Sequence, residues 1–278
     1  MRRTTTPGAA RVGRDPEGER PTREPLPTRV EDLPSLPAAY AETLDAGLAG
    51  LGLDLPAPVR AAVDDHVRLL LAWTAAINLT AIRDPEAVAR EHVLDSLAAL
   101  PLLRARGVDR LLDLGSGGGY PGFPLAAALP ARRALLVDSV AKKARFLETA
   151  IAAIGLTGRV DVATRRAEEL ARDRRERARW PLVTARAVAP LAELVELGLP
   201  LLAQGGLLLA WKREPLDAEL AAAEPSVAAL GGVLGEVMAV PVEGLADHRL
   251  IAVVKRRPTP DRFPRDPAAR RRQPWPIT

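Results

Sequence analysis

The stretch that decides the fold is LLDLGSGGGYPGFPLA, residues 111–126. An apolar run ends around Asp113, and a second apolar segment begins near residue 123. Between them stand Gly115, Gly117 and Gly119. This order is typical of a buried parallel strand that opens into a tight turn and then a helix. Glycine tolerates positive φ and lets a ligand approach bare backbone, so the stretch predicts a site for a nucleoside-bearing molecule at the carboxyl end of a strand.

The spacing of the glycines bears on the identity of that ligand. The dinucleotide fingerprint G-x-G-x-x-G places a pyrophosphate on the helix start, whereas here G-S-G-G-G follows an acid, Asp113. Its carboxylate would repel a pyrophosphate and accept a hydrogen bond from an ammonium group. S-adenosylmethionine (SAM) carries an α-ammonium and no phosphate, so we predict a SAM pocket with Asp113, Gly115 and Gly117 at the cofactor. A glycine turn of purely structural purpose would have the same pattern.

The composition excludes several classes of chemistry. Hydrophobic residues make up 47% of the 278 residues and aromatic ones only 3%, so the core must be aliphatic. The absence of cysteine excludes disulfides, cysteine-bound zinc, iron–sulfur centres and a thiolate nucleophile. The three histidines match no metal spacing, and no apolar run is long enough to cross a membrane. We expect a cytoplasmic protein with no metal and no membrane partner. We also expect a monomer.

Composition divides the chain into four parts. The first is rich in Pro, Arg, Thr and Glu without an apolar period, which is typical of disorder. Near the other end, residues 255–278 carry eight basic and two acidic residues. This excess suits an arm that reaches a polyanion, and a solvated disordered tail would carry the same charge. The parts are a disordered extension (1–37), a short N-terminal helical segment (38–105), a SAM-binding methyltransferase domain (106–257) and a basic C-terminal tail (258–278).

The helical segment shows three stretches with helical periodicity, 38–53, 56–75 and 84–100. The last of them begins with Asp84 and Pro85, a good N-cap and first-turn pair. We therefore expect an all-α prelude to the sheet.

Seven apolar runs follow, separated mostly by helical patterns, the clearest from Val140 to Ile154. Such alternation predicts an α/β fold with a parallel, doubly wound sheet. The last two runs lack a long helix between them, so they can pair antiparallel at the sheet edge. A Rossmann-like seven-stranded sheet with an antiparallel last strand is the class I SAM-dependent methyltransferase fold. The candidate strands are 110–114, 133–138, 160–163, 182–185, 206–211, 234–240 and 249–254.

Polar residues follow the second and third strands. Asp138 comes about 20 residues after the glycine turn, where Rossmann-type folds place an acid on the ribose hydroxyls, and it would equally cap the next helix. Lys142 and Lys143 stand in the first turn of that helix, an unfavourable place for cations, so we assign them to the substrate; solvated lysines are the alternative. Ala167 and Glu168 follow the third strand beside the expected adenine, or form an acidic first turn.

The fourth strand ends in Thr-Ala-Arg-Ala, residues 184–187, at the position that faces the methyl donor. Amino-group methyltransferases commonly have an Asp/Asn-Pro-Pro-aromatic motif there, which this chain lacks. Arg186 cannot act as a base because its guanidinium stays protonated. The site therefore suits a nucleophile with a free lone pair, such as guanine N7, and catalysis by positioning. Arg186 is the candidate catalytic residue.

Together these motifs resemble the RsmG (GidB) family of bacterial 16S rRNA guanine-N7 methyltransferases. The resemblance covers roughly residues 38–270. Beyond the glycine turn it rests on Asn78 to Arg83 with His92, Asp95 and Ser96, on Asp138-Ser139 with Lys142-Lys143, on Thr184 to Ala187, on Lys212, on His248-Arg249 and on Phe263-Pro264-Arg265.

The resemblance implies transfer of a methyl group from SAM to N7 of a specific guanine in 16S rRNA of the small ribosomal subunit. It implies SAM contacts at Gly115, Tyr120, Ala167, Glu168 and Arg186. We assign RNA contacts to Lys142, Lys143, Lys212, Arg265 and Arg271. A methyltransferase of a small metabolite and a non-catalytic nucleotide-binding module are the alternatives. Only the RNA enzyme should lose substrate affinity steeply as salt rises.

Overall fold

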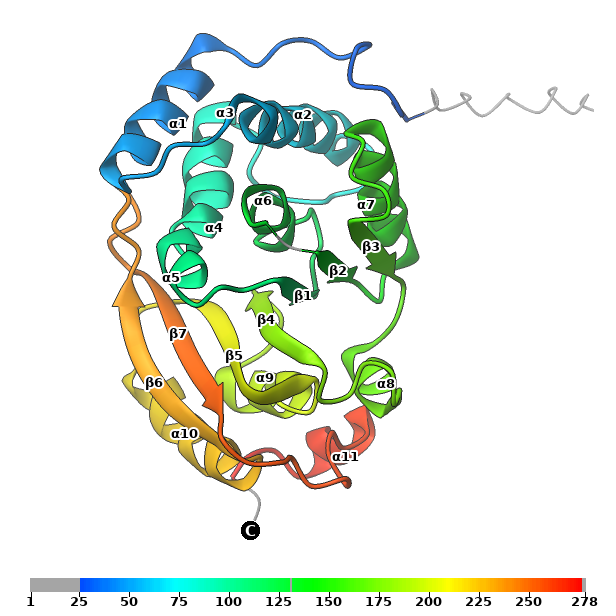
Figure 1. Ribbon diagram of the computed structural model, residues 1–278, viewed down its shortest axis with the longest axis vertical. Coiled ribbons are helices and arrows are strands. Elements are labelled where there is room, and N and C mark those ends of the chain that lie inside the picture. Colours follow the sequence, from blue (N-terminus) through cyan, green and yellow to red (C-terminus); the bar gives the residue numbers. More distant parts are fainter. Residues whose placement is uncertain (1–25, 131, 277–278) are drawn as a thin grey trace, which may run out of the picture.

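A seven-stranded sheet forms the centre of the computed structural model, which describes residues 26–130 and 132–276 (Figure 1). The strand order is β3-β2-β1-β4-β5-β7-β6, and each strand falls on one of the seven predicted runs. The strands are β1 Arg110–Leu114, β2 Arg133–Val137, β3 Val160–Ala163, β4 Trp180–Arg186, β5 Leu202–Arg213, β6 Gly232–Ala239 and β7 His248–Lys255.

The pairing of the strands confirms the predicted fold class. The pairs among β1 to β5 are parallel, and β7 runs antiparallel to both of its neighbours, β5 and β6. The order of the strands reverses between β1 and β4, and ligands of doubly wound sheets bind outside the carboxyl ends of the strands at such a reversal. The glycine turn follows β1 at this point.

Helices cover both faces of the sheet. Leu111 packs with the helices that precede β3, whereas Leu112 and Leu114 pack with those that follow it, because successive strand residues point to opposite faces. No helix within residues 26–130 and 132–276 has the length and hydropathy to cross a membrane. The helices are α1 Ala38–Gly50, α2 Ala57–Thr74, α3 Pro85–Val88, π-helix η1 Ala89–Leu94, α4 Asp95–Leu97, α5 Leu100–Ala105, α6 Gly122–Ala128, α7 Ala141–Ala153, α8 Ala167–Arg172, α9 Leu191–Gly198, α10 Asp217–Ala229 and α11 Pro267–Arg272.

The third predicted helix changes its winding along its length. Its N-cap is confirmed, because Asp84 Oδ2 accepts a hydrogen bond from the backbone N–H of Ala87 at 2.8 Å. The helix then passes from α3 into the π-helix η1 and on into α4. π-Helical turns are rare in proteins, and those that occur are often at functional sites. The apolar pattern did not indicate this turn, which carries Glu91 and His92.

Part of the predicted N-terminal extension is ordered. Residues 26–37 lie along α2, where Trp73 Nε1 donates to Pro27 O at 2.7 Å and Arg68 Nη2 donates to Val30 O at 2.9 Å. Val30 is buried. These contacts correct the prediction of disorder for residues 26–37, while residues 1–25 lie outside the described part of the chain.

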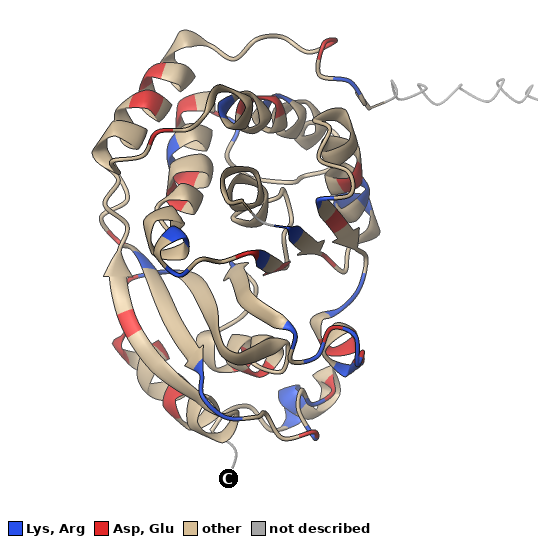
Figure 2. Ribbon diagram, in the orientation of Figure 1, with Lys and Arg blue, Asp and Glu red and all other residues tan. Residues whose placement is uncertain are grey.

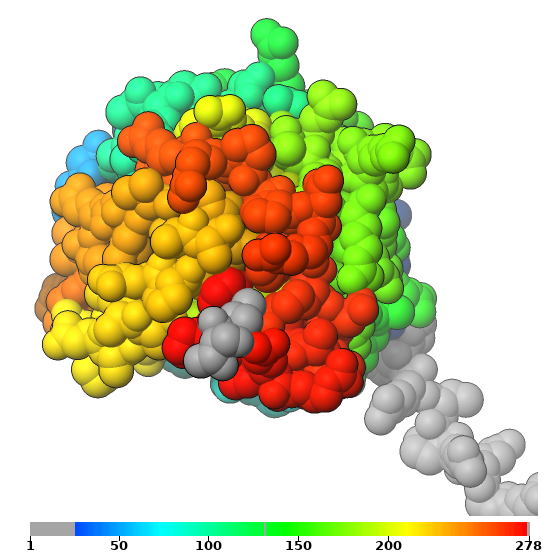
Figure 3. All heavy atoms as spheres, turned by 90° about the horizontal axis from the view of Figure 1, so that it is seen from below, coloured from blue at the N-terminus to red at the C-terminus, as the bar shows by residue number. Residues whose placement is uncertain are grey.

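The predicted C-terminal tail is also folded where the structure describes it. Residues 258–276 lie flat on the molecule beside α8, α9 and α10 (Figure 3). Phe263 is buried in the core on that face of the sheet. The described tail is therefore no free arm, because Phe263, Arg265 and Arg270 bind it to the domain.

Candidate active site

The glycine turn links β1 to α6 in a conformation that needs glycine. Gly115, Gly117 and Gly119 have φ of +67°, +57° and +97°, a region that other residues rarely adopt. Gly122, at the start of α6, lies so close to β1 that an added Cβ would come within 2.6 Å of Asp113 Cβ. The sequence pattern thus reflects both backbone torsion and close packing of the helix on the strand.

Two cavities open beside this turn, and Gly115 lines both. The larger has a volume of about 470 Å³ and the smaller about 250 Å³. The larger cavity is lined by Thr80, Glu91, His92, Asp95, Tyr120, Lys143, Arg186, Lys212, Arg213 and His248, among others. The smaller is lined by Asp138, Arg166, Ala167, Glu168, Val188, Glu193 and Arg270, among others. Seven of the predicted cofactor residues therefore line one cavity or the other: Gly115, Gly117, Tyr120, Asp138, Ala167, Glu168 and Arg186.

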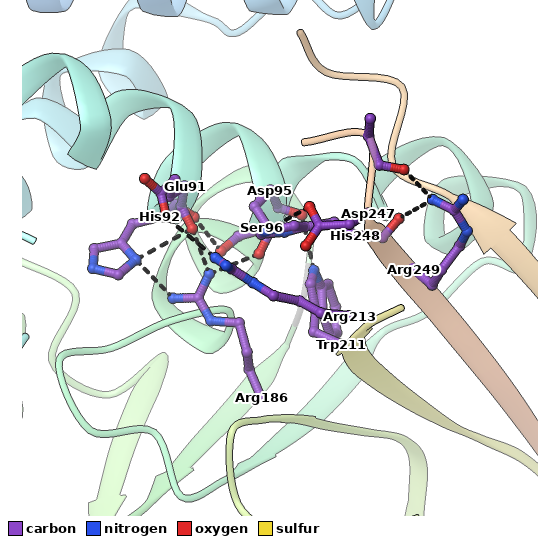
Figure 4. A network of polar contacts seen from close by, with 11 residues as sticks. Glu91, His92, Asp95, Ser96, Arg186, Trp211, Arg213, Asp247, His248 and Arg249 are labelled. Carbon is purple, nitrogen blue, oxygen red and sulfur yellow. Dashed lines mark hydrogen bonds and ion pairs between the residues drawn. The ribbon is translucent and has the colours of Figure 1, made fainter. Parts of the chain in front are cut away.

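Arg186 forms the centre of a polar network in the larger cavity (Figure 4). Its Nη1 donates to Asp95 Oδ2 and to the carbonyl of Glu91, each at 2.8 Å. Asp95 is fully buried, and its Oδ1 lies 2.9 Å from His248 Nδ1. Trp211 Nε1 donates to the carbonyl of Asp95 at 2.9 Å. The predicted catalytic residue is thus held by groups from η1 and α4, and Asp95 is held in turn by residues of β5 and β7.

The protonation state of His92 follows from its contact with Arg186. His92 Nδ1 lies 3.0 Å from Arg186 Nη2 and 3.2 Å from the Glu91 carbonyl. We assign the accepting role to Nδ1, because a guanidinium only donates and the Glu91 carbonyl already accepts from Arg186 Nη1 at 2.8 Å. The proton of the neutral ring is then on Nε2, which donates to Thr80 Oγ1 at 2.8 Å. Burial, and then the charge of Arg186, lowers the pKa of His92 to about 3. Thr80 Oγ1 also accepts from Ile82 N–H at 3.0 Å, so its own hydroxyl hydrogen is left for a ligand.

Tyr120 covers the other side of this network. Its ring stacks on His92 with 4.7 Å between centroids, and Arg186 Cζ lies 5.5 Å from the ring centroid. The Tyr120 hydroxyl is 3.2 Å from His66 Nδ1 beneath the turn. Burial raises the pKa of Tyr120 and lowers the pKa of His66 to about 3, so both groups stay neutral. His66 in turn stacks on Phe123 of α6 at 4.0 Å.

In the smaller cavity, Asp138 ties the turn to the next helix. Its Oδ2 accepts from Gly117 N–H at 2.9 Å and its Oδ1 from Val140 N–H at 2.8 Å. Val140, not Asp138, is the residue that precedes α7, so Asp138 supports the helix start without being its N-cap. The contact with ribose stays a prediction, and the remaining lone pairs of the carboxylate allow it.

The structure bears on both interpretations of Ala167 and Glu168, and their contact with adenine stays a prediction. They form the first turn of α8, and they also line the smaller cavity. Glu168 is buried and forms an ion pair with Arg270 of α11. The sequence did not indicate that partner.

Asp113 departs from its predicted role. It is fully buried and lines neither cavity, and its Oδ1 accepts from Thr184 Oγ1 at 2.7 Å. Burial raises the pKa of Asp113 to about 6. A direct bond to the ammonium group of SAM is therefore not supported. Asp113 instead joins β1 to β4 beneath the turn through its hydrogen bond with Thr184. Gly122 of α6 packs directly against its side chain.

The predicted RNA contacts have different surroundings. Lys143 and Lys212 line the larger cavity, and Lys142 is exposed at the start of α7. Lys212 Nζ also donates to Ala189 O at 2.8 Å and pairs with Glu219 at 2.5 Å.

The two tail arginines differ from each other. Arg265 pairs with the fully buried Glu196 at 2.6 Å, which corrects its assignment to RNA. Its guanidinium is spent in neutralising a carboxylate that has no access to water. Arg271 is exposed.

Comparison with known proteins agrees with this geometry. The family model described as rRNA small subunit methyltransferase G (GidB) matches residues 60–245. The chain belongs to this family. A relative from Roseiflexus castenholzii named ribosomal RNA small subunit methyltransferase G is 43% identical over 196 residues, which cover 70% of this chain and 83% of that protein. A relative of the same name from Dehalococcoides mccartyi is 38% identical over 220 residues, 79% of this chain and 93% of that protein.

A solved structure shares the fold. An O-methyltransferase from Bacillus cereus in complex with SAH superposes with a TM-score of 0.51 at 20% identity, over 69% of this chain and 91% of that chain. The family resemblance and the class I methyltransferase fold predicted from the sequence are both confirmed.

The neutral histidines predict how stability depends on pH. His66 and His92 bind protons only after unfolding between pH 6.5 and about 3, so the free energy of unfolding should fall as pH drops through this window. Each contributes up to about 1.4 kcal/mol per pH unit, and the raised pKa of Asp113 opposes them with one group. We expect His66→Gln to reduce the dependence of the unfolding free energy on pH by the equivalent of about one proton. Urea unfolding at several pH values measures this dependence. An unchanged slope would show that His66 is charged in the folded protein.

Proposed function

We propose that this protein transfers the methyl group of SAM to N7 of a specific guanine in 16S rRNA of the small ribosomal subunit. The observation that carries the proposal, beyond family membership, is the state of the acids in the larger cavity. Among the described residues that line it, Asp95 is paired with Arg186 and Glu91 with Arg213. His92 accepts from Arg186 through its free ring nitrogen. Both acids of the cavity are thus paired, and His248, which also lines it, is directed to Asp95 through Nδ1. N7 suits such a site, because it needs no general base.

In this proposal SAM occupies the two cavities, which share Gly115. A Cβ on Gly115 would lie 2.7 Å from Val188 Cγ2, so a side chain there would crowd the point that both cavities share. In our proposal Asp138, Ala167 and Glu168 hold the adenosine, while Gly115, Gly117, Tyr120 and Arg186 lie at the methionine and methyl end. When bound, SAM supplies an electrophilic methyl carbon on a sulfonium. The lone pair of N7 would form the new C–N bond as the C–S bond breaks and S-adenosylhomocysteine leaves with that electron pair. No proton leaves the base, and the positive charge passes from the sulfonium to the purine.

The donors that remain in the larger cavity suit guanine. Guanine presents two acceptors, N7 and O6, on this edge, whereas adenine presents an amino group in place of O6. Thr80 has an unspent hydroxyl hydrogen, and Arg186 keeps N–H groups beyond the three contacts described. These donors favour O6 and leave N7 to react. Fixing the base in this way is the positioning effect on which the reaction depends.

In this proposal the RNA binds lysine side chains at and near the mouth of the larger cavity. Lys143 and Lys212 line the larger cavity and Lys142 lies on the surface nearby. Such phosphate contacts weaken steeply with salt. Lys142, Lys143, Lys212 and Arg271 stay predicted RNA contacts. Action as a monomer in the cytoplasm without a metal also stays a prediction.

The decisive experiment maps N7-methylguanine in small-subunit rRNA from cells with and without the gene. We expect one guanine to lose its methyl group in the deletion strain. The purified protein should restore it with SAM on rRNA or subunits from that strain, and less efficiently as salt rises. Replacing the target by 7-deazaguanine, which has no N7 lone pair, should abolish transfer. Methylation of free nucleosides with no salt dependence would instead indicate a small-metabolite enzyme.

Gly115→Ala should impair SAM binding more than folding. The new Cβ would come too close to Val188 at the point that both cavities share. We therefore expect the Kd for SAM to rise about tenfold or more. Gly107→Ala is the matched control, since Gly107 has a similar φ of +62° with no atom within 4 Å of its Cβ position. Both variants carry similar backbone strain, so only the first should lose affinity in calorimetric titration. Equal affinities would contradict the placement of SAM.

Arg186→Ala should reduce transfer by about a hundredfold or more, because the base loses its positioning group. It also leaves the buried Asp95 with one fewer partner, at a cost on the order of 3 kcal/mol in unfolding free energy. The double variant Asp95→Asn/Arg186→Ala removes the stranded charge and should recover thermal stability without recovering transfer. Full turnover by either variant would exclude Arg186 from the reaction.

A further inference from the structure

The C-terminal segment, residues 258–276, follows the stretch that the family model matches, which ends at residue 245. It lies flat on the surface next to α8 and α10 (Figure 3). Figure 2 shows the basic residues of α11 next to the charged residues of α8. The segment therefore reaches the sheet end where the smaller cavity opens.

Arg270 is the residue of this segment that enters the cavity wall. It is 8% exposed and lines the cavity together with Glu168 and Glu193. Its Nη2 pairs with Glu168 Oε1, and its Nε donates to Glu193 Oε1 at 3.0 Å. Its Nη1 donates to the carbonyl of Arg265 at 2.8 Å. One guanidinium thus joins α8, α9 and the segment itself.

A second, separate anchor keeps α11 in place. Arg265 donates to Glu196 Oε1 at 2.9 Å and to Oε2 at 2.6 Å, and Trp275 Nε1 donates to the same Oε2 at 2.7 Å. Glu196 is fully buried, and an unpaired buried carboxylate is strongly destabilising. The stability of the domain therefore favours the docked segment. This anchor does not line either cavity, so it fixes the segment without forming the site.

We propose that Arg270 is a positioning residue of the SAM site and that the C-terminal segment forms the outer wall of the adenosine cavity. The proposal rests on the proposed function. Arg270 neutralises the buried Glu168 and fixes the direction of its carboxylate. The carboxylate therefore presents a single orientation to the bound ligand. Because the wall is complete only when the segment is docked, SAM binding and docking stabilise each other by linkage. The segment serves cofactor binding through Arg270, while Arg262, Arg271 and Arg272 stay exposed.

The test compares Arg270→Ala with Arg272→Ala in the full-length protein, using S-adenosylhomocysteine (SAH) as the probe. Arg272 is an exposed residue of the same helix and matches the lost charge. We expect the Kd for SAH to rise about tenfold in Arg270→Ala, the effect of one charge-assisted hydrogen bond, and to stay unchanged in Arg272→Ala. The KM for rRNA should change little in Arg270→Ala. Arg270→Lys, which keeps the charge without the planar fork, should give an intermediate Kd and covers the case in which the alanine variant is unstable.

Hydrogen exchange separates this role from a merely structural one. SAH should slow exchange in residues 258–276 of the wild type and should lose this effect in Arg270→Ala. Unchanged SAH affinity in both Arg270 variants, or a raised KM for rRNA alone, would overturn the inference and restore the segment as an RNA arm. Failure of SAH to bind the wild-type protein would instead remove the proposed function, and this inference with it.

Discussion

The buried carboxylate of Asp95 is the interaction on which the site depends. It lies at the junction of η1 and α4 and is shared by Arg186 from β4 and His248 from β7. A charge without access to water is tolerated only when it is paired and hydrogen-bonded. The helical segment and the sheet must therefore meet in one geometry, and that geometry places Arg186, His92 and Thr80 around the larger cavity.

The glycine turn determines how closely a ligand can approach the backbone. Three glycines with positive φ shape the turn, and two of them, Gly115 and Gly117, line the cavities. The carboxylate of Asp138 holds the turn by accepting a hydrogen bond from the Gly117 N–H. Beneath the turn, Gly122 packs against Asp113 and allows α6 to lie close to β1. The same motif therefore combines residues that line the cavities with residues that only support them. Sequence spacing alone does not separate the two, which is why Asp113 was assigned to the cofactor although it is buried beneath the turn and bonded to Thr184.

The C-terminal segment shows how charge counting misleads. Its basic residues predicted an arm for a polyanion, but Arg265 and Arg270 are paired with Glu196 and Glu168 from distant parts of the chain. Net charge over a stretch says nothing about partners that folding brings from elsewhere. The acids that neutralise these arginines stand some 70 and 100 residues earlier, so no local pattern reveals them.

The sequence by itself determined the sheet, because buried strands need apolar runs and turns need glycine. All seven strands, the N-cap at Asp84 and the family follow from such local signals, as do most residues at the cavities. Tertiary structure alone decided which charges are free. The hub of Asp95, His248 and Trp211, the π-helical turn and the contact of Arg270 with Glu168 all join elements far apart in the chain. Their chemistry depends on burial and distance, which a linear pattern does not contain.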